Sequence, residues 1–324
     1  MHIRSIAQKD DEVEFECKTK EEDEDSDVKL KDTIDFKITT GARGLGVKVQ
    51  YEQEVKTGDM KNETETEYEL IFDRIVEYRK TSGGDDAYDW DSDVIVQTLL
   101  LNRWESFSEV TDDSDGVLSY FAASSLDGHI TFNFTVSRAD QGERVTANKM
   151  KIDFSLVDFP WDSTDTYVAL MSTVESKKKV DVESVDREMD DGPAKKAKDV
   201  IITFDQAQDT VGVIPFGEYT WEETAEAIEP TSNETTTALQ RSGVGVPATI
   251  RVVATSPTPT EIMAARRISF SFVGDAAISA SNIYWDPEAG IGYSESSSGV
   301  GRGLSSSLLF LSGAFSWMFL VFAF

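Results

Sequence analysis

The sequence predicts an all-β protein: an antiparallel β-sandwich of jelly-roll type with about a dozen strands, followed by a C-terminal hydrophobic tail. Three observations lead to this prediction. Apolar residues alternate with polar residues over many short segments, glycine-containing turn signals separate these segments, and helical periodicity is confined to short pieces.

The alternation is clearest in residues 45–51, 150–156 and 268–272, where every second residue is apolar. This period places the apolar side chains on one face of a strand and the polar side chains on the other. Further strands are predicted at Val13–Cys17, Thr33–Ile38, Tyr68–Tyr78, Val94–Leu101, Val117–Ser124, Tyr167–Val174, Val200–Phe204, Val211–Pro215 and Thr249–Ala254.

Turn signals stand between the strands, as at Asp115-Gly116. Leu126-Asp-Gly-His129 lies between two alternating segments and predicts a hairpin with a two-residue loop. Helical spacing is found only in two short pieces, Trp221–Ile228 and Pro259–Ala265, which we expect to be short helices.

These patterns suggest three regions. We expect a β-sandwich ectodomain over residues 1–287, in which residues 176–199 form an exposed charged loop or linker. Residues 288–303 form a polar spacer, and residues 304–324 form an uncharged hydrophobic tail.

Small residues, a short polar spacer and a terminal hydrophobic segment together are typical of the attachment signal for a glycosylphosphatidylinositol (GPI) anchor. Ser296, Ser297 and Ser298 are the predicted attachment residues, because small residues follow them. The alternative is a transmembrane helix, for which the tail is long enough. In both cases the membrane is a partner through the C-terminus.

A GPI-anchored protein enters the secretory pathway, yet the first residues contain no apolar segment of the leader type. We therefore expect that the true start of the protein differs from Met1; the alternative is a tail anchor that holds a cytosolic β domain. Three N-x-S/T sequons favour the secretory route, at Asn62, Asn133 and Asn233.

The net charge of -29 arises from 60 acidic and 31 basic residues. A nucleic-acid partner is therefore excluded, because such binding depends on positive charge that releases counterions. Strong acidity keeps a protein soluble and favours cationic partners or divalent ions. The single cysteine, Cys17, lies at an alternating apolar position and is expected to be buried.

The acidic loop that begins at Gly83 is the most distinctive local feature. Its carboxylates supply the hard oxygen ligands that Ca²⁺ prefers, and they predict a calcium site at Asp85, Asp86, Asp89, Asp91 and Asp93. The spacing imitates the start of an EF-hand loop, but Val94 and Leu100 stand where that motif needs Gly and Glu. The alternative interpretation is a solvated acidic turn.

Catalytic patterns are weak, so no catalytic residue is predicted. His129 follows a turn without a nucleophile elbow, and one cysteine with two histidines makes a zinc site improbable. Carboxylate pairs for glycoside hydrolysis cannot be singled out among so many acids. Four tryptophans, Trp90, Trp104, Trp161 and Trp221, form either a sugar-stacking platform or parts of the core.

The segments Ile75-Val-Glu-Tyr78, Asp93-Val-Ile-Val96, Lys149-Met-Lys-Ile-Asp-Phe154 and Phe159-Pro-Trp161, with the acidic loop and Trp104, carry a resemblance. Over residues 70–175, and near Trp285, the chain resembles uncharacterised extracellular β-rich proteins of marine organisms. The resemblance implies an extracellular β-rich protein and no particular activity.

The expected function is that of a GPI-anchored cell-surface protein with a non-catalytic adhesion, structural or ligand-binding role towards a protein or a glycan. Two alternatives stay open: an extracellular glycan-acting hydrolase, and a tail-anchored membrane protein with a cytosolic β domain. Apart from the possible calcium, no cofactor is expected.

Overall fold

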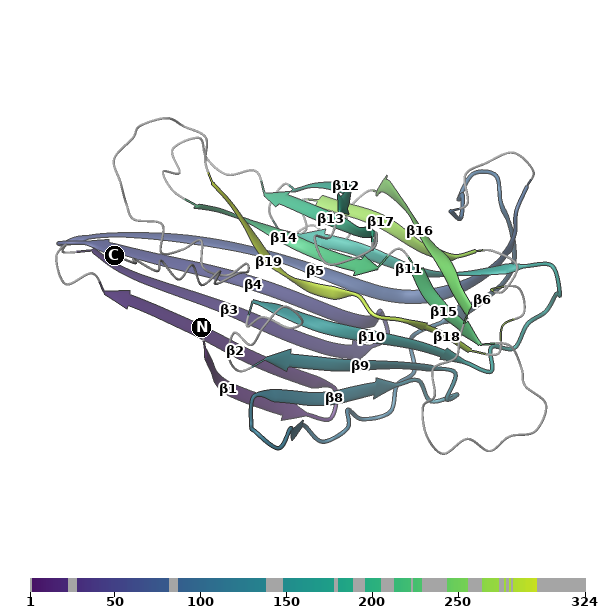
Figure 1. Ribbon diagram of the computed structural model, residues 1–324, viewed down its shortest axis with the longest axis horizontal. Helices are drawn as coiled ribbons and strands as arrows, with labels where there is room; N and C mark the ends of the chain where they lie inside the picture. Colours follow the sequence, from purple (N-terminus) through teal and green to yellow (C-terminus); the bar gives the residue numbers. More distant parts are fainter. Residues whose placement is uncertain are drawn as a thin grey trace, which may run out of the picture.

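The computed structural model describes residues 2–22, 28–81, 87–137, 148–177, 180–188, 196–204, 213–222, 224–228, 244–255, 264–273, 277, 280 and 282–295. Within these residues the chain forms two antiparallel sheets packed face to face, which confirms the predicted β-sandwich (Figure 1). None of the described residues forms a helix with the length and apolarity that a bilayer crossing needs.

Sheet I has the strand order β1-β2-β3-β4-β5-β11-β17-β16, and β6 continues the line of β4 beside the end of β5. Its strands are β1 (His2–Lys9), β2 (Glu12–Glu22), β3 (Val28–Gly41), β4 (Gly44–Thr57), β5 (Met60–Arg79), β6 (Val94–Leu100), β11 (Tyr167–Ser176), β16 (Val244–Thr255) and β17 (Ala264–Phe272).

Sheet II has the order β7-β8-β9-β10, after which β10 pairs with both β18 and β19. From there β19 leads to β14, β13 and β12, while β18 leads to β15. The strands are β7 (Thr111–Asp112), β8 (Leu118–Ser124), β9 (Ile130–Ser137), β10 (Lys149–Val157), β12 (Val180–Glu188), β13 (Lys196–Phe204), β14 (Val213–Glu222), β15 (Thr224–Ile228), β18 (Asn282–Trp285) and β19 (Glu288–Glu295).

The core lies between the sheets and is rich in aromatic rings, because the alternation turns every second side chain inward. Phe72 of sheet I packs on Phe132 of sheet II with 5.1 Å between ring centroids. Phe154 of sheet II stacks on Phe272 of sheet I at 6.0 Å. Cys17 is buried in this core, as predicted.

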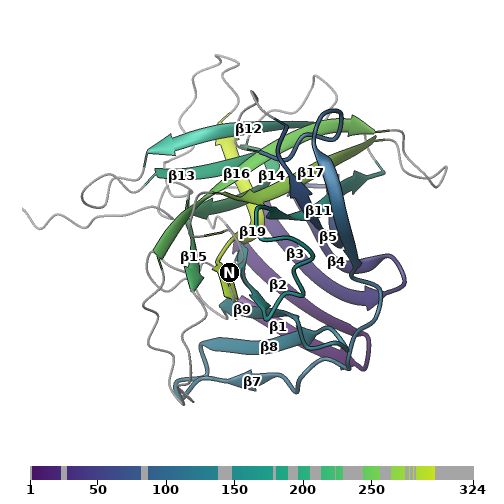
Figure 2. The ribbon, with the colours of Figure 1, turned by 90° about the vertical axis from the view of Figure 1, so that its right-hand side faces the viewer.

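Both lateral edges of the sandwich are bridged. On one edge β16 pairs with β15 of sheet II through residues 244–247 and with β17 of sheet I through residues 248–255. On the other edge β1 lies near β8 in both ribbon views (Figures 1 and 2), and residues 105–110 connect them. Such closure covers strand edges that could otherwise pair with other chains.

The described residues contain nineteen strands, more than the dozen expected. Part of the excess comes from residues 176–199, where the predicted exposed loop is wrong: β12 and the first half of β13 lie there and pair with each other. A strand needs only its backbone for pairing, so a highly charged segment can still belong to a sheet.

Three other predictions need correction. Trp221–Ile228 is not a helix, because Trp221 ends β14 and residues 224–228 form β15; Ala264 and Ala265 begin β17, and residues 259–263 lie outside the described residues. The polar spacer was predicted to begin at residue 288, but this boundary is too early, because residues 288–295 form β19 (Glu288–Glu295) of sheet II. A hairpin joins β8 and β9 as predicted, but its loop has four residues, Leu126–His129, rather than two, because the N–H of Ser125 donates to the carbonyl of Ile130 at 2.9 Å; Gly128 in this loop has φ 77°.

Candidate functional site

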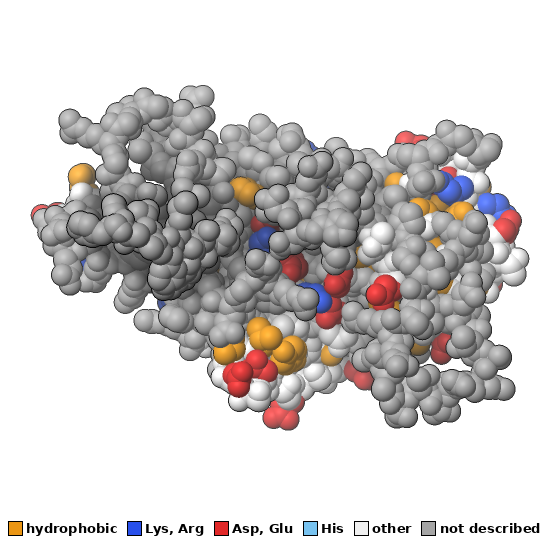
Figure 3. Space-filling model, in the orientation of Figure 1, with side chains coloured by type: hydrophobic (Ala, Val, Ile, Leu, Met, Phe, Trp, Pro, Cys, Tyr) orange, Lys and Arg blue, Asp and Glu red, His pale blue; other side chains and the backbone are white. Residues whose placement is uncertain are grey.

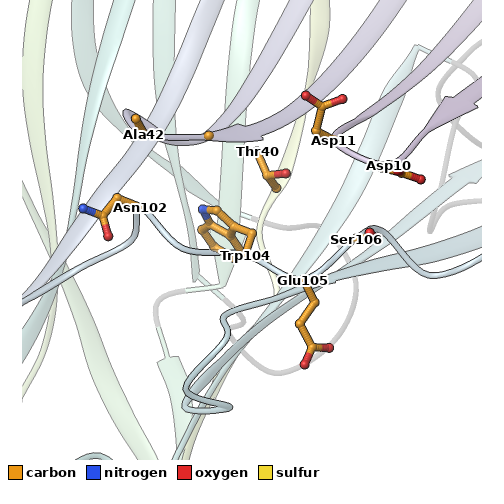
Figure 4. Close-up of a pocket in the computed structure, with 9 residues that line it drawn as sticks. Asp10, Asp11, Thr40, Ala42, Asn102, Trp104, Glu105 and Ser106 are labelled. Carbon is orange, nitrogen blue, oxygen red and sulfur yellow. The ribbon is translucent and has the colours of Figure 1, made fainter.

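A cleft of about 250 Å³ opens at one end of the sandwich. We call it the end cleft. Three connections meet there: the β1–β2 turn, the β3–β4 turn and the segment that follows β6 (Figure 4). Its lining residues are Asp10, Asp11, Thr40, Gly41, Ala42, Asn102, Trp104, Glu105 and Ser106.

Backbone hydrogen bonds hold the walls of the end cleft in place. The N–H of Thr40 donates to the carbonyl of Asp11 at 3.0 Å, which joins the two turns. The N–H of Phe107 donates to the carbonyl of Asp10 at 3.1 Å, and the N–H of Glu105 donates to Ser124 in β8 at 2.9 Å. The cleft is therefore built on the sheets rather than on free loops, so its shape is preformed.

Trp104 lies in the middle of the end cleft (Figure 4). Its indole N–H donates to the carbonyl of Leu101 at 3.0 Å, and its ring packs on Phe132 of the core at 6.1 Å. These two contacts fix the ring while leaving it only partly buried. A fixed, partly exposed indole offers apolar surface to a ligand at a low cost in side-chain entropy.

Polar side chains surround this indole. Asn102 lies to one side of it and Ser106 to the other, while the carboxylates of Asp11 and Glu105 point in opposite directions (Figure 4). All four side chains are exposed. The carboxylates do not converge on one point, and no group of metal-ligating side chains occurs anywhere in the described part of the chain.

The end cleft was not predicted from the sequence, apart from Trp104 as a candidate for sugar stacking. Its residues come from three separate stretches of the chain, and Asp10-Asp11 resembles any acidic turn. The four tryptophans do not form one platform. Trp221 is buried in the core, Trp90 packs on Tyr88, and Trp161 packs on Phe159 with its indole N–H donating to Ala280 at 3.1 Å.

In the acidic loop, the carboxylates of Asp89 and Asp93 accept hydrogen bonds from backbone N–H groups. Asp93 accepts hydrogen bonds from the N–H of Thr81 at 3.1 Å and of Asp89 at 2.9 Å. Asp89 accepts one from the N–H of Asp91 at 2.9 Å. Asp85 and Asp86 lie outside the described residues. The calcium site therefore stays a prediction, and the visible role of Asp89 and Asp93 is to shape the turn.

Aromatic residues attach this loop to the outer face of sheet I. Tyr88 is buried against Tyr78, with 5.0 Å between ring centroids, and Trp90 packs on Tyr88 at 5.5 Å. The N–H of Tyr88 also donates to the hydroxyl of Ser271 in β17 at 2.8 Å. The loop thus covers a second, smaller apolar cluster that contains Val76, Tyr78, Tyr88, Ala169 and Met171.

The predicted modification sites are only partly described. Asn62 is exposed near the tip of the β4–β5 hairpin, and Asn133 is exposed on the outer face of sheet II between β8 and β10. A glycan can therefore extend from both without entering the core. Asn233 and the attachment residues Ser296, Ser297 and Ser298 lie outside the described residues, as does the hydrophobic tail.

The outer face of sheet II carries a row of alternating charges (Figure 3). Lys149 binds Glu218 at 3.0 Å, and Lys151 lies 2.9 Å from Asp153 and 3.5 Å from Asp286. Burial raises the pKa of the neighbouring Glu288, an effect that Lys149 opposes and Glu218 reinforces. This row is a structured ion-pair network that also places two glutamates on adjacent strands.

His129 does not join a catalytic group among the described residues. Its ring Nδ1 lies 3.1 Å from the carbonyl of Val157, where the β8–β9 hairpin meets the end of β10. This contact gives His129 a structural role at the turn.

No model of a known protein family matches the chain, and no curated protein is similar enough to it to count as a relative.

Proposed function

We propose that this protein is a non-catalytic binding or adhesion protein displayed on the outer cell surface by a GPI anchor. The observation that carries the proposal is the end cleft: a preformed hollow with a fixed indole and exposed polar side chains, whose carboxylates diverge. A hydrolytic site would instead need carboxylates that converge on one bond. A hollow of this kind is suited to binding a ligand without changing it.

The membrane attachment rests on the tail at residues 304–324 and on the small residues at Ser296–Ser298. Treatment of intact cells with phosphatidylinositol-specific phospholipase C tests it. Release of the protein into the medium supports a GPI anchor at the outer surface. Retention on the cells indicates a spanning tail, and protection from external protease would favour the tail-anchored cytosolic alternative.

N-glycosylation supports the same topology, because the sugar is added in the secretory lumen. Peptide-N-glycosidase F should increase the mobility of the native protein on a gel. Asn62→Gln and Asn133→Gln should each remove one step of that shift. If neither sequon carries a glycan in the native protein, the proposed surface location loses its main support.

A glycan-acting hydrolase is the second candidate, and Glu288 is the observation that favours it. A carboxyl group whose pKa is raised by burial can act as a general acid, and Glu218 lies on the adjacent strand. Release of reducing ends from polysaccharides by the wild type, abolished in Glu288→Gln, would support this candidate. Activity retained in Glu288→Gln and in Glu218→Gln would count against it.

A further inference from the structure

We infer that the end cleft is a binding site for an uncharged oligosaccharide, which stacks on Trp104 and hydrogen-bonds to Asn102 and Glu105. This inference rests on the proposed binding function and names the ligand class for it. It draws on the ring, the polar side chains around it, and the sign of the charge at the rim.

The ring decides how the ligand is held. Because the indole N–H of Trp104 already donates to Leu101, the ring offers a ligand its apolar surface and not a donor. The indole of Trp104 packs on Phe132 of the core, so the part of the indole that a ligand can reach faces the cleft. The C–H-rich face of a sugar ring is an apolar surface of matching size, and aromatic rings bind such flat surfaces without an ion pair.

The polar groups decide what lies at the edges of the ligand. Asn102 offers a donor and an acceptor, and Glu105 offers acceptors only. Sugar hydroxyls both donate and accept, so they match both groups, and hydrogen bonds to a carboxylate are stronger than neutral ones. In Figure 4 both side chains point outward from the indole, so a ligand stacked on the ring must extend past the ring edge to reach them, as an oligosaccharide with hydroxyls along its whole edge does.

The charge at the rim excludes other ligands. Asp10, Asp11 and Glu105 line the cleft, and none of its lining residues is basic. Sulfated, phosphorylated or sialylated glycans would be repelled. A compact cation would need carboxylates aimed at one point, whereas those of Asp11 and Glu105 point apart (Figure 4). An uncharged sugar can meet the carboxylates one at a time.

The size of the cleft fits a short piece of glycan. Its volume of about 250 Å³ lies below the roughly 300–1,000 Å³ typical of pockets for drug-sized ligands. It therefore holds one or two sugar units of a longer chain, and affinity on a cell surface would come from several copies acting together.

The test uses the lipid-released protein on an array of immobilised uncharged glucans, mannans, galactans and chitin fragments, with sulfated and sialylated glycans alongside. We expect binding to at least one uncharged class and none to the anionic glycans. Asn102→Ala and Glu105→Gln should each weaken that binding by about tenfold, as expected for loss of a hydrogen bond in the site. Glu109→Gln is the matched control, because Glu109 is exposed on the same segment but outside the lining.

Three results would overturn the inference. Binding to an uncharged glycan that survives both cleft substitutions would place the glycan site elsewhere and leave the proposed binding function standing. Preference for sulfated or sialylated glycans would refute the charge argument. If the protein binds no glycan but is still released from cells by phospholipase, the inferred glycan ligand is refuted while the proposed surface location stands. Quenching of tryptophan fluorescence by the bound glycan, absent in folded Trp104→Phe, would tie the binding to the ring.

Discussion

Asp35 lies in the middle of the outer face of sheet I and illustrates how the acidity of this chain acts on single residues. Glu16 of β2 and Gln50 of β4 are its partners across the strands, and Glu14, Lys18, Glu52 and Lys48 occupy the diagonal positions. One of its carboxyl oxygens is buried without a hydrogen-bond partner. The pKa of Asp35 is raised from 3.8 to about 6, chiefly by burial, and the negative charges of Glu16 and Glu14 contribute to this shift.

This shift has a definite sign for stability. The folded state holds the proton of Asp35 more tightly than the unfolded state, so the free energy of unfolding should fall as the pH rises from about 4 to about 6. Asp35→Asn should stabilise the protein at pH 7 by about 1 kcal/mol, allowing for partial exposure, and have little effect at pH 4. Urea unfolding at the two pH values measures this.

Asp59→Asn, at the exposed β4–β5 turn, serves as the control for Asp35→Asn. An equal gain from Asp35→Asn at both pH values would contradict the role of Asp35.

Glu77 has the opposite character, because it is fully buried and saturated with hydrogen bonds. Its carboxylate accepts from the N–H groups of Asp162 and Ser163, at 2.9 and 3.0 Å, and from the side chains of Thr166 and Gln97. These bonds hold residues 158–166, the connection from β10 to β11, across the end of the sandwich. The carboxylate of Glu77 therefore holds the β10–β11 connection in place and is not available to a ligand.

Glu77→Gln should lower the free energy of unfolding by about 2–4 kcal/mol, because an amide NH₂ must then face a donor in a buried place. Chemical denaturation measures the loss. Glu63→Gln, exposed on the same strand, should change stability by less than about 0.5 kcal/mol. Equal effects of the two substitutions would show that the loop does not depend on Glu77.

At the scale of elements, the start of β4 is the tightest junction. Gly44 has φ 124°, and a Cβ there would lie 2.0 Å from the carbonyl oxygen of Phe72 in β5. At this point the strand that pairs with β5 changes from β4 to β6. Just beyond it, the N–H of Leu101, which follows β6, donates to the backbone carbonyl of Asp73 at 2.9 Å. Only glycine lets the two backbones approach so closely.

Gly44→Ala should therefore destabilise the protein by at least about 2 kcal/mol, through both backbone strain and the clash. Gly41→Ala, at the other end of the same turn, should be nearly neutral, because nothing lies within 4 Å of its Cβ. Thermal unfolding of the two variants decides the matter. If Gly44→Ala is as stable as Gly41→Ala, the backbone approach at Phe72 does not restrict position 44 to glycine.

Between β1 and β8, the side-chain amide of Gln8 makes the two backbone hydrogen bonds that a neighbouring strand would otherwise make. The amide of Gln8 donates to the carbonyl of Ser108 at 2.8 Å and accepts from the N–H of Val110 at 3.1 Å. Gln8→Ala should increase hydrogen exchange at Val110 by about five- to tenfold, the equivalent of one lost hydrogen bond. Ser5→Ala, on the same strand, should leave exchange there unchanged.

The elements also show why sequence patterns were only partly sufficient. β10, a strand with one wet face, was predicted almost to the residue because its alternation reports burial directly. Only the second half of β17 was predicted, at residues 268–272, and its serine face is buried beneath the loop that carries Tyr88. β12 was missed because charged residues hide its strand character, and β14 to β15 looked helical over Trp221–Ile228. β12 pairs with β13, the next strand along the chain, and β15 pairs with the more distant β16 and β18, so backbone pairing overrode the local pattern in both cases.

At the scale of the whole molecule, the net charge of -29 acts against compactness. Ion pairs such as Lys48–Glu67 and Lys37–Glu12 tie neighbouring strands of sheet I together, but they engage only part of the acidic side chains. Screening by added salt should therefore weaken the repulsion among the excess carboxylates more than it weakens the attraction within the ion pairs. Raising NaCl from about 20 to about 300 mM should raise the melting temperature by a few degrees.

Differential scanning fluorimetry across this salt range tests the balance, with Lys48→Gln as a comparison that removes one attractive pair. A melting temperature that falls with salt would show that the ion-pair network outweighs the net repulsion.

The sequence by itself determined the fold class, the burial of alternating residues and the apolar character of residues 304–324, because each depends on local periodicity or composition. The tertiary structure decided the rest. Bridging of both edges through β16 and Gln8, the packing of Tyr88 on sheet I, and the meeting of Asp10, Thr40 and Trp104 in one cleft all join residues far apart in the chain. Such contacts arise from strand pairing across the whole molecule, which no local pattern encodes.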